Sequence, residues 1–192
     1  MATYVLALCN LKGGTAKTTS AVYLSTCLHS RGEQVTLLDA DNEQSALNWA
    51  SDGGLPFPVI AADIDRLGRQ ARQLEGYVVI DTPPNNREAL LTAALAANTV
   101  LVPVAPTAQD VNRLEPTLDL LTQVEERLDK DMTSILLVRY DKRRVLAREF
   151  LDVFADYPVL KNKISNRVAY QSVLGDTPTY LLEYDAVLKE LL

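Results

Sequence analysis

A glycine-rich turn between an apolar run and a helical pattern is the feature that most restricts how this chain can fold. The apolar run covers Val5–Cys9 and the helical pattern covers about Lys17–Ser30, with Gly13 and Gly14 between them. Because glycine has no side chain, backbone N–H groups in such a turn can close around phosphate oxygens, and the dipole of the following helix adds positive potential. A strand, a glycine turn and a helix N-terminus in this order predict a phosphate-binding loop.

The residues of this loop are the candidate nucleotide contacts: Lys12, Gly13, Gly14, Thr15, Ala16, Lys17, Thr18 and Thr19. Lys17 is expected to reach the β- and γ-phosphates of ATP, and the Thr18 hydroxyl to coordinate Mg²⁺. The general pattern G-x-x-x-x-G-K-S/T is only partly matched, because its glycine positions hold Leu11 and Ala16. An alanine with positive φ or in close contact with phosphate would lower affinity or turnover, whereas an alanine with helical dihedrals would fit the first turn.

Apolar, β-rich runs alternate with helical patterns along the chain. The candidate strands are Tyr4–Cys9, Gln34–Asp39, Tyr77–Asp81, Thr99–Val104, Ser134–Arg139 and a short one near Val159–Lys161. The candidate helices are Lys17–Ser30, Glu43–Ala50, Ile64–Leu74, Asn86–Ala97, Gln109–Lys130 (with a break or late start at Pro116), Val145–Asp156 and Tyr180–Leu192. Several strands are continuous apolar runs, which is typical of strands buried on both faces. This order predicts an α/β fold with a mostly parallel sheet, helices on both faces and a ligand site at the carboxyl ends of the strands.

Length and composition favour one globular domain over residues 1–192. The chain has 192 residues, of which 47% are hydrophobic, so it can bury a sizeable core. Neither a run of membrane-spanning length nor a secretory leader is present in the sequence, so a cytoplasmic location is expected. Cys9 and Cys27 are expected to be buried free thiols, which suits that compartment.

Acidic residues at the ends of two strands complete the candidate site. Asp39 and Asp41 lie at the end of the second strand, and we expect Asp41 to face the site and Asp39 to face the loop or the sheet edge. Asp81 ends the strand Tyr77–Asp81, where an acid facing a phosphate loop can hold Mg²⁺ through a water molecule. Arg139 ends a later strand, where stacking on adenine and a plain surface position are equally open.

The two lysines of the loop resemble the deviant phosphate-binding loop of the ParA/MinD ATPase family, K-G-G-x-x-K followed by two Ser/Thr positions. The resemblance implies that Lys12 reaches the nucleotide of the opposite subunit in a dimer, while Lys17 acts within its own subunit. It also implies that Asp41 orients the attacking water, that Asp39 supports the loop and the hydration shell of the metal, and that Asp81 plays the Walker B role. The sequence departs from the family at Ala16, where glycine is usual.

A basic stretch near the C-terminus contrasts with the net charge of −6. Residues 139–167 hold eight basic and four acidic residues. Such a surface suits salt-dependent, sequence-independent contact with a polyanion, although basic runs are often only solvated faces. The segment from Ile164 to Tyr170 resembles a family segment that contacts DNA, which implies a DNA contact at Arg167 with Lys161 and Lys163 as neighbours.

The resemblance covers nearly the whole chain and implies a small ParA-type partition ATPase. ATP and Mg²⁺ would drive a homodimer that binds DNA non-specifically, and hydrolysis stimulated by a centromere-binding, ParB-like partner would release it. Such a protein is expected in the cytoplasm, associated with the nucleoid. The acidic C-terminal stretch Tyr184–Leu192 argues against a membrane-binding helix, and the start of the chain at the first strand argues against an N-terminal helix-turn-helix region.

Three alternatives are open at this point. The first is a MinD-like positioning ATPase that acts on a membrane or a protein partner. The second is a small-molecule enzyme on the same scaffold, of the dethiobiotin synthetase type, against which the first loop lysine argues. The third is a nucleotide switch with negligible turnover, because of Ala16.

Overall fold

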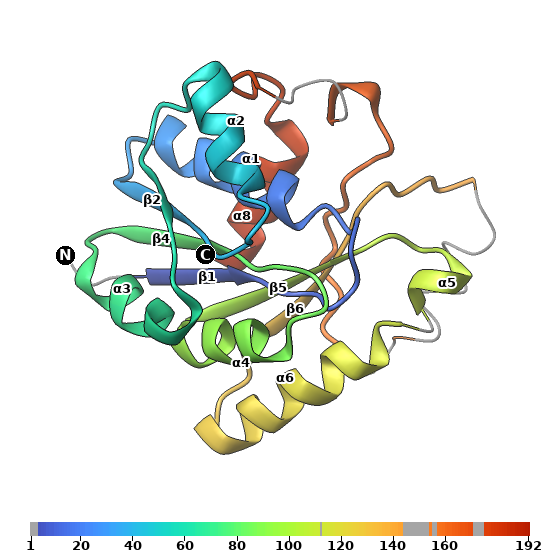
Figure 1. The fold of residues 1–192 in the computed structure, drawn as a ribbon. Coiled ribbons are helices and arrows are strands. Elements are labelled where there is room, and N and C mark those ends of the chain that lie inside the picture. Colours follow the sequence, from blue (N-terminus) through green and yellow to red (C-terminus); the bar gives the residue numbers. More distant parts are fainter. Residues whose placement is uncertain (1–3, 112, 144–153, 155–156, 171–174) are drawn as a thin grey trace.

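A six-stranded parallel sheet forms the centre of the fold. The computed structural model describes residues 4–111, 113–143, 154, 157–170 and 175–192 (Figure 1). The strand order is β3-β2-β4-β1-β5-β6. The strands are β1 (Tyr4–Leu8), β2 (Val35–Asp39), β3 (Val59–Ala61), β4 (Tyr77–Asp81), β5 (Thr99–Val104) and β6 (Thr133–Leu137). Each pair of neighbouring strands in this order is parallel, so the predicted fold class is confirmed.

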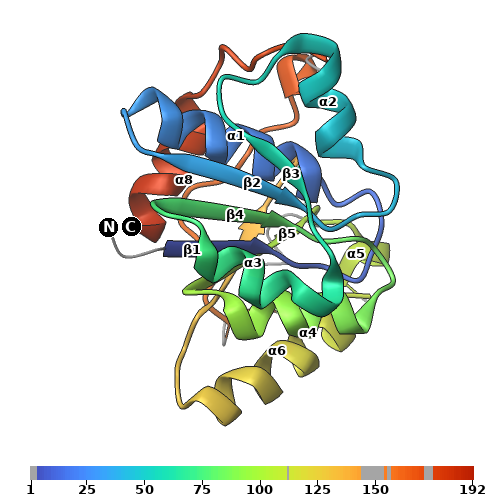
Figure 2. The ribbon, with the colours of Figure 1, turned by 60° about the vertical axis from the view of Figure 1, so that its left-hand side comes forward.

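Helices cover both faces of the sheet (Figures 1 and 2). The helices α1 (Lys17–Ser30), α2 (Ser45–Gly53) and α8 (Leu182–Leu191) pack on one face. The helices α3 (Leu67–Gln73), α4 (Arg87–Ala96) and α6 (Glu115–Leu128) pack on the other face. The short helix α5 (Ala108–Val111) follows β5, and single turns of 3-10 helix lie at Ile64–Arg66 and Val168–Tyr170.

The two cores follow directly from the period-2 alternation of side chains along the strands. In β1, Leu6 and Leu8 belong to the core under α1 and α8, whereas Val5 and Ala7 belong to the core under α4 and α6. Each of these strand residues is at most 3% exposed. A central strand buried on both faces must be apolar at every position, which explains why these runs do not alternate in polarity.

Most predicted elements are confirmed, with differences at the edges of the sheet. Helix α1 and strands β4 and β5 have the predicted bounds, and α6 begins at Glu115 with Pro116 in its first turn, as expected where a missing N–H costs no hydrogen bond. The prediction of a strand at Val159–Lys161 was wrong: Val159 makes only an isolated bridge with Ile135. Strand β3 was not predicted. The predicted helix Val145–Asp156 lies outside the described residues except for position 154.

Among the described residues, none of the helices combines the length and the apolar character that a membrane crossing requires.

The register of the central strands brings the predicted acids to one place. Asp39 of β2 and Leu8 of β1 are the register partners of Asp81 on the two sides of β4. The glycine loop leaves β1 directly after Leu8 and returns to α1 at Lys17. The loop and both strand-end acids therefore meet at the carboxyl edge of the sheet, as expected for a parallel α/β fold.

The C-terminal end of α2 is held by a later segment at residues 175–177. The Trp49 indole donates a hydrogen bond to the Asp176 carbonyl at 2.8 Å, and the Thr177 hydroxyl donates to the Gly54 carbonyl at 3.1 Å. Backbone contact is so close at Gly53 that a Cβ atom there would lie 1.2 Å from the Gly175 carbonyl oxygen. Only glycine fits at position 53 without a shift of one of the two backbones.

Gly53→Ala is expected to lower the free energy of unfolding by about 1–3 kcal/mol, because overpacking against a backbone carbonyl cannot be relieved by a side-chain rotation. Gly68→Ala in α3 is the matched control, since its Cβ would make only ordinary contacts at 3.5 Å or more. The control should be neutral or stabilising, by up to about 1 kcal/mol, because alanine has the higher helix propensity. Urea unfolding measures both variants, and equal effects would contradict the close contact.

Candidate nucleotide-binding site

A cavity of about 250 Å³ opens between the glycine loop, the end of β2 and the end of β6. It is lined by Gly14, Thr15, Ala16, Lys17, Thr18, Thr19, Asp41, Glu43, Ser45, Pro84 and Arg139. The loop and the first turn of α1 form one wall, so backbone N–H groups at the positive end of a helix face the space, as in anion sites at helix N-termini. The structure thus brings together every predicted loop residue from Gly14 to Thr19 with Asp41 and Arg139.

The loop backbone explains Gly14 and shows an anomaly at Ala16. Gly14 has φ +72°, a left-handed conformation that glycine adopts without steric cost, whereas a Cβ at Gly13 would make only ordinary contact with Pro84 at 3.6 Å. Ala16, the residue before α1, has φ 65° and ψ 30°. Its left-handed conformation decides between the alternatives that the sequence left open: a methyl group is strained here.

Lys17 and Asp81 are two buried, opposite charges beneath the loop. Lys17 is 6% exposed, and its ammonium donates a hydrogen bond to the Lys12 carbonyl at 3.2 Å. Burial lowers the pKa of Lys17, an effect that the nearby carboxylates of Asp81 and Asp41 oppose. Lys17 lines the cavity, where a phosphate would add further negative charge beside the ammonium.

The carboxyl group of Asp81 is buried in an energetically unfavourable environment. It is fully buried, and neither of its oxygens accepts a hydrogen bond of ordinary geometry from the described residues. Burial raises the pKa of Asp81 to about 7, while the neighbouring Thr18 hydroxyl and the Lys17 ammonium oppose this increase. Unsatisfied carboxylate oxygens beside a threonine hydroxyl are the donor set that a hydrated magnesium ion takes up next to bound phosphates.

No group of three or more His, Cys, Asp and Glu side chains arranged to hold a metal ion occurs in the part of the chain that the structure describes. Mg²⁺ requires few protein ligands, because it keeps several waters and shares the phosphate oxygens of its substrate. Thr18 and Asp81 therefore fit magnesium that arrives with a nucleotide, and do not form a separate metal centre.

The two acids of the second strand have different surroundings. Asp39 is 2% exposed and accepts backbone hydrogen bonds from Asp41, Ala46 and Leu47, each at 3.0 Å. Burial raises the pKa of Asp39 and these three hydrogen bonds oppose the rise. Asp39 thereby joins the loop to the N-terminus of α2, whereas Asp41 lines the cavity. The metal-supporting role of Asp39 stays a prediction.

Lys12 is held by an acid that the sequence did not reveal. Its ammonium pairs with Asp110 in α5, and Asp110 also accepts a hydrogen bond from the Thr107 hydroxyl. The side chains of Lys12 and Asp110 are 18% and 9% exposed. The two residues are far apart in sequence, so only the return of the chain after β5 places this carboxylate beside the loop. Glu43 and Ser45 are further lining residues that sequence reasoning missed.

A smaller cavity of about 40 Å³ adjoins the first one. It shares Ala16, Thr19 and Arg139 with the first cavity and is further lined by Val138, Ile164, Ser165, Asn166, Arg167, Tyr170 and Tyr184. Arg139 has φ 51°, an unfavourable conformation for arginine. Its position at the junction of both cavities is the one expected of a residue beside the base of a bound nucleotide, and that role stays a prediction.

The candidate DNA residues lie on one segment after β6 but have separate contacts. Arg167 pairs with Glu183 at 3.1 Å, and the Lys163 ammonium lies 5.3 Å from the ring centre of Tyr140. The backbone N–H of Lys161 donates to the Glu190 carboxylate at 2.6 Å. Arg144 and Arg148, which also belong to the basic stretch, lie outside the described residues.

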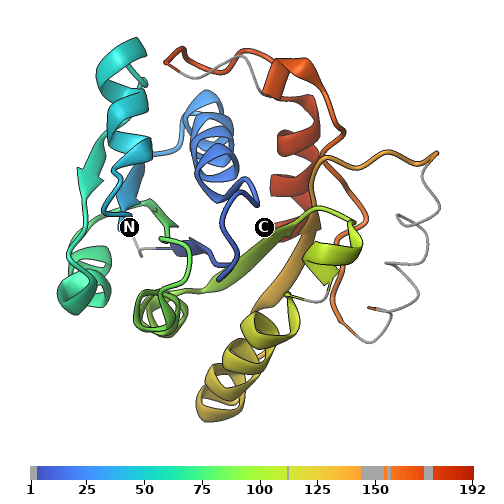
Figure 3. The same cartoon turned by 45° about the vertical axis from the view of Figure 1, so that its right-hand side comes forward.

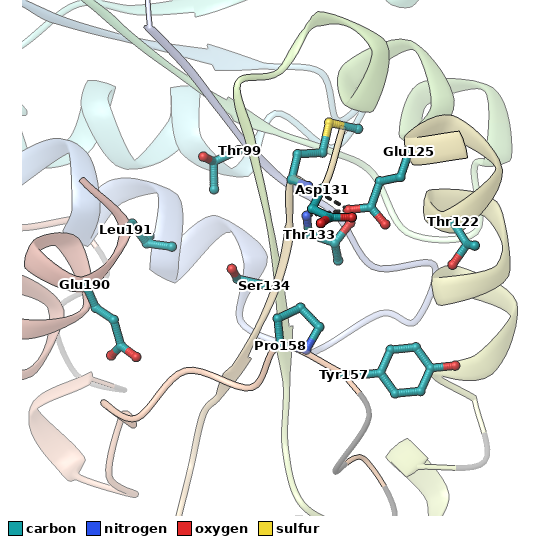
Figure 4. A pocket seen from close by; sticks show the side chains of 11 residues that line it. Thr99, Thr122, Glu125, Asp131, Thr133, Ser134, Tyr157, Pro158, Glu190 and Leu191 are labelled. Atoms are coloured by element: carbon teal, nitrogen blue, oxygen red, sulfur yellow. Dashed lines mark hydrogen bonds between the residues drawn. The ribbon is translucent and has the colours of Figure 1, made fainter. Parts of the chain in front are cut away.

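A larger cavity lies near the first residues of β5 and β6, and none of the predicted nucleotide-site residues lines it (Figure 4). It has a volume of about 720 Å³ and is lined mainly by polar residues near the first residues of β5 and β6, including Thr99, Thr133 and Glu125. The Glu125 carboxylate accepts hydrogen bonds from the backbone N–H groups of Met132 and Thr133, so it joins α6 to β6. Although this cavity is larger, it is not the candidate nucleotide site, because the described residues that line it include no basic residue and no helix N-terminus.

The geometry defines a P-loop nucleotide-binding protein, and comparison with known proteins identifies its family. Residues 6–176 match the family model described as the CobQ/CobB/MinD/ParA nucleotide binding domain. The chain therefore belongs to this family, and its relatives place it among the ParA-type ATPases.

Individual relatives come from different biological settings. Maintenance of carboxysome distribution protein A of Gloeobacter kilaueensis is 40% identical over 119 residues, which cover 59% of this chain and 55% of that protein. Thus the match with this relative spans about half of its length. Protein ParA of Rhizobium radiobacter is 26% identical over 180 residues, which cover 88% of this chain and 81% of that protein.

A solved structure supports the fold. Cobyrinic acid a,c-diamide synthase from Mycobacterium smegmatis, with bound ADP and magnesium, has a TM-score of 0.75 at 22% identity. The match covers 97% of this chain and 93% of that chain. At this identity the likeness concerns the fold alone.

Ala16→Gly is expected to raise the free energy of unfolding by up to about 1 kcal/mol, because relief of the left-handed strain outweighs the larger chain entropy of glycine in the unfolded state. Ala21→Gly, a buried position inside α1, is the control and should lower stability by about 1 kcal/mol or more. Urea unfolding checks both, and a destabilised Ala16→Gly protein would refute strain at this position.

Proposed function

We propose that this chain hydrolyses ATP slowly and uses the reaction as a switch for DNA partition. The observation that carries the proposal is the cavity at the N-terminus of α1 that Lys17, Thr18 and Asp41 line, with the fully buried Asp81 next to Lys17 and Thr18. A buried cation next to a buried acid whose oxygens accept no hydrogen bond of ordinary geometry from the described residues forms a site that a polyphosphate and its metal ion would complete.

Each residue has a distinct task in this proposal. Backbone N–H groups of the loop and the Lys17 ammonium bind and orient the β- and γ-phosphates. Thr18 and Asp81 would hold magnesium, which neutralises charge on the phosphates when bound. Asp41, at the cavity wall, orients a water molecule for attack on the γ-phosphate, and positioning of this kind supplies much of the rate enhancement in phosphoryl transfer.

Lys12 converts the site into a dimerisation switch. In the present structure its charge is compensated by Asp110 within the same chain. A second subunit that offers a bound nucleotide provides a stronger counter-charge, so Lys12 exchanges one partner for the other. ATP then favours the dimer because it binds the two states with different affinities.

The proposed biological role is plasmid or chromosome partition in the cytoplasm, in association with the nucleoid. The ATP-bound homodimer binds DNA non-specifically through Arg167, Lys161 and Lys163, and a centromere-binding, ParB-like protein stimulates hydrolysis and release. Similarity to ParA supports this role. A second candidate is positioning of a protein cargo, which the 40% identity to a carboxysome distribution protein favours.

Two measurements separate these roles from the remaining alternatives. Co-sedimentation with plasmid DNA in ATP but not in ADP supports partition or cargo positioning over DNA, whereas co-sedimentation with liposomes alone supports a MinD-like role. An ATP-dependent dimer without measurable phosphate release would identify a switch with negligible turnover, for which the strain at Ala16 gives a physical reason.

Lys17→Ala is expected to weaken ATP binding by about tenfold to a hundredfold, since it removes charge-assisted hydrogen bonds to phosphate. Isothermal titration calorimetry measures the affinity, and circular dichroism checks that the variant is folded. Lys130→Ala is the control, because that exposed lysine bonds to the Asn98 carbonyl far from the loop. Wild-type ATP hydrolysis by Lys17→Ala would refute the proposed site.

Lys12→Ala is expected to bind ATP with an affinity within about threefold of the wild-type value. The reason is that the Lys17 ammonium, which the variant keeps, dominates the contacts with a nucleotide bound to the same subunit. Its ATP-dependent dimer should be absent in analytical ultracentrifugation. If this variant dimerised at the same ATP concentrations as the wild-type protein, the bridging role of Lys12 would be ruled out. The proposal of the nucleotide site itself would be unaffected.

A further inference from the structure

One carboxylate in the first turn of α8 holds the segment that carries the candidate DNA contact. Glu183 accepts hydrogen bonds from the Ser165 backbone N–H at 2.8 Å and from the Tyr170 hydroxyl at 2.9 Å. It also accepts a hydrogen bond from the Arg167 guanidinium at 3.1 Å. All three donors belong to residues 165–170, so a single side chain fixes this segment to the C-terminal helix.

Glu183 is ionised at neutral pH and compensates the charge of Arg167. Burial raises the pKa of Glu183, but the hydrogen bonds from Ser165, Tyr170 and Arg167 outweigh this and lower it below the usual value. The Arg167 side chain is 49% exposed, whereas that of Glu183 is 17% exposed. Arg167 also lies over the Tyr180 ring, 5.4 Å from its centre. The guanidinium is thus accessible to solvent but already paired with an anion.

The same segment contacts the helix that begins at the phosphate loop. The ring of Tyr170 packs edge-on against Tyr23 of α1 and Tyr184 of α8, at centroid distances of 5.2 and 5.6 Å. The hydroxyl groups of Tyr184 and Ser20 are 3.1 Å apart, which links α8 to the second turn of α1. Figure 3 shows α1 and α8 side by side. This aromatic cluster connects the Glu183 contacts to the nucleotide site.

The small cavity next to the loop makes that connection direct. Its walls include Ala16 and Thr19 from the start of α1, and Arg167 and Tyr170 from the segment that Glu183 holds. The start of α1 and the segment that Glu183 holds therefore border the same space.

We propose that Glu183 is a positioning residue that keeps Arg167 charge-compensated and so weakens its contact with DNA phosphates. The proposal rests on the proposed DNA-binding function and names the group that controls it. Only Nε of the Arg167 guanidinium donates to Glu183, so its other N–H groups can still reach a phosphate, but the positive charge offered to that phosphate is reduced while the carboxylate is its neighbour.

Glu183→Gln tests the proposal, since glutamine keeps the shape and an accepting oxygen for Ser165 but removes the charge. The probe is a fluorescent duplex DNA of random sequence, titrated without nucleotide at several salt concentrations. The variant is expected to bind severalfold more tightly, and its log K against log[salt] slope should steepen by about one, as for one additional phosphate contact. Adding Arg167→Ala to Glu183→Gln should abolish both changes.

Two further variants separate charge compensation from other effects. Asp185→Asn removes the same charge from the same helix, but Asp185 pairs with Arg31 and Lys189, so its salt slope should stay at the wild-type value. Tyr170→Phe removes one hydrogen bond from Glu183 without changing its charge and should also leave the slope unchanged. Circular dichroism confirms that each variant is folded.

The outcomes distinguish this proposal from the proposed function. If wild type binds DNA in ATP but Glu183→Gln shows no gain without nucleotide, or if Tyr170→Phe gains equally, charge compensation by Glu183 is overturned while partition stands. If no protein binds DNA under any nucleotide condition, the proposed function fails and the role of Glu183 fails with it. A gain that persists after Arg167→Ala is added overturns the assignment of Arg167 as the compensated partner.

Discussion

The burial of two opposite charges at the carboxyl edge of the sheet is the constraint on which the rest of the site depends. Lys17 and Asp81 are 6% and 0% exposed, and removing charged groups from water is costly unless partners are supplied. The parallel register sets Asp81 beside the end of β1, so the loop must close over it. A bound nucleotide with its metal ion would supply partners for both groups, which would link nucleotide binding to the local stability of the site.

The two loop lysines differ through their surroundings. Lys17 is 6% exposed and lines the cavity, whereas Lys12 does not line it and is paired with Asp110. A similar arrangement recurs at Arg167 and Glu183. At both places a basic side chain proposed to act on an external anion has an internal carboxylate as its partner, which reduces the positive charge offered to that anion.

Much of the fold was predictable because the central strands and α1 are specified by local pattern. Strands β4 and β5 were predicted to their observed bounds, since a strand buried on both faces must be apolar throughout. The edge was harder: β3 has only three residues and pairs with one neighbour, and Val159 forms a single bridge. In the site, the loop and the acids Asp39, Asp41 and Asp81 were found because each follows a strand end, a position that sequence order reveals.

The sequence by itself determined the chemistry: a glycine turn with two lysines before a helix, and acids at strand ends, are sufficient to predict a site for phosphate and magnesium. The tertiary structure decided the backbone state of Ala16 and the partners of the charged groups. Ala16 is left-handed because the loop must turn into α1 at that residue. Asp110 and Glu183 reach Lys12 and Arg167 only after the chain has folded back across the sheet, and contacts between residues so arranged leave no periodic pattern in the sequence.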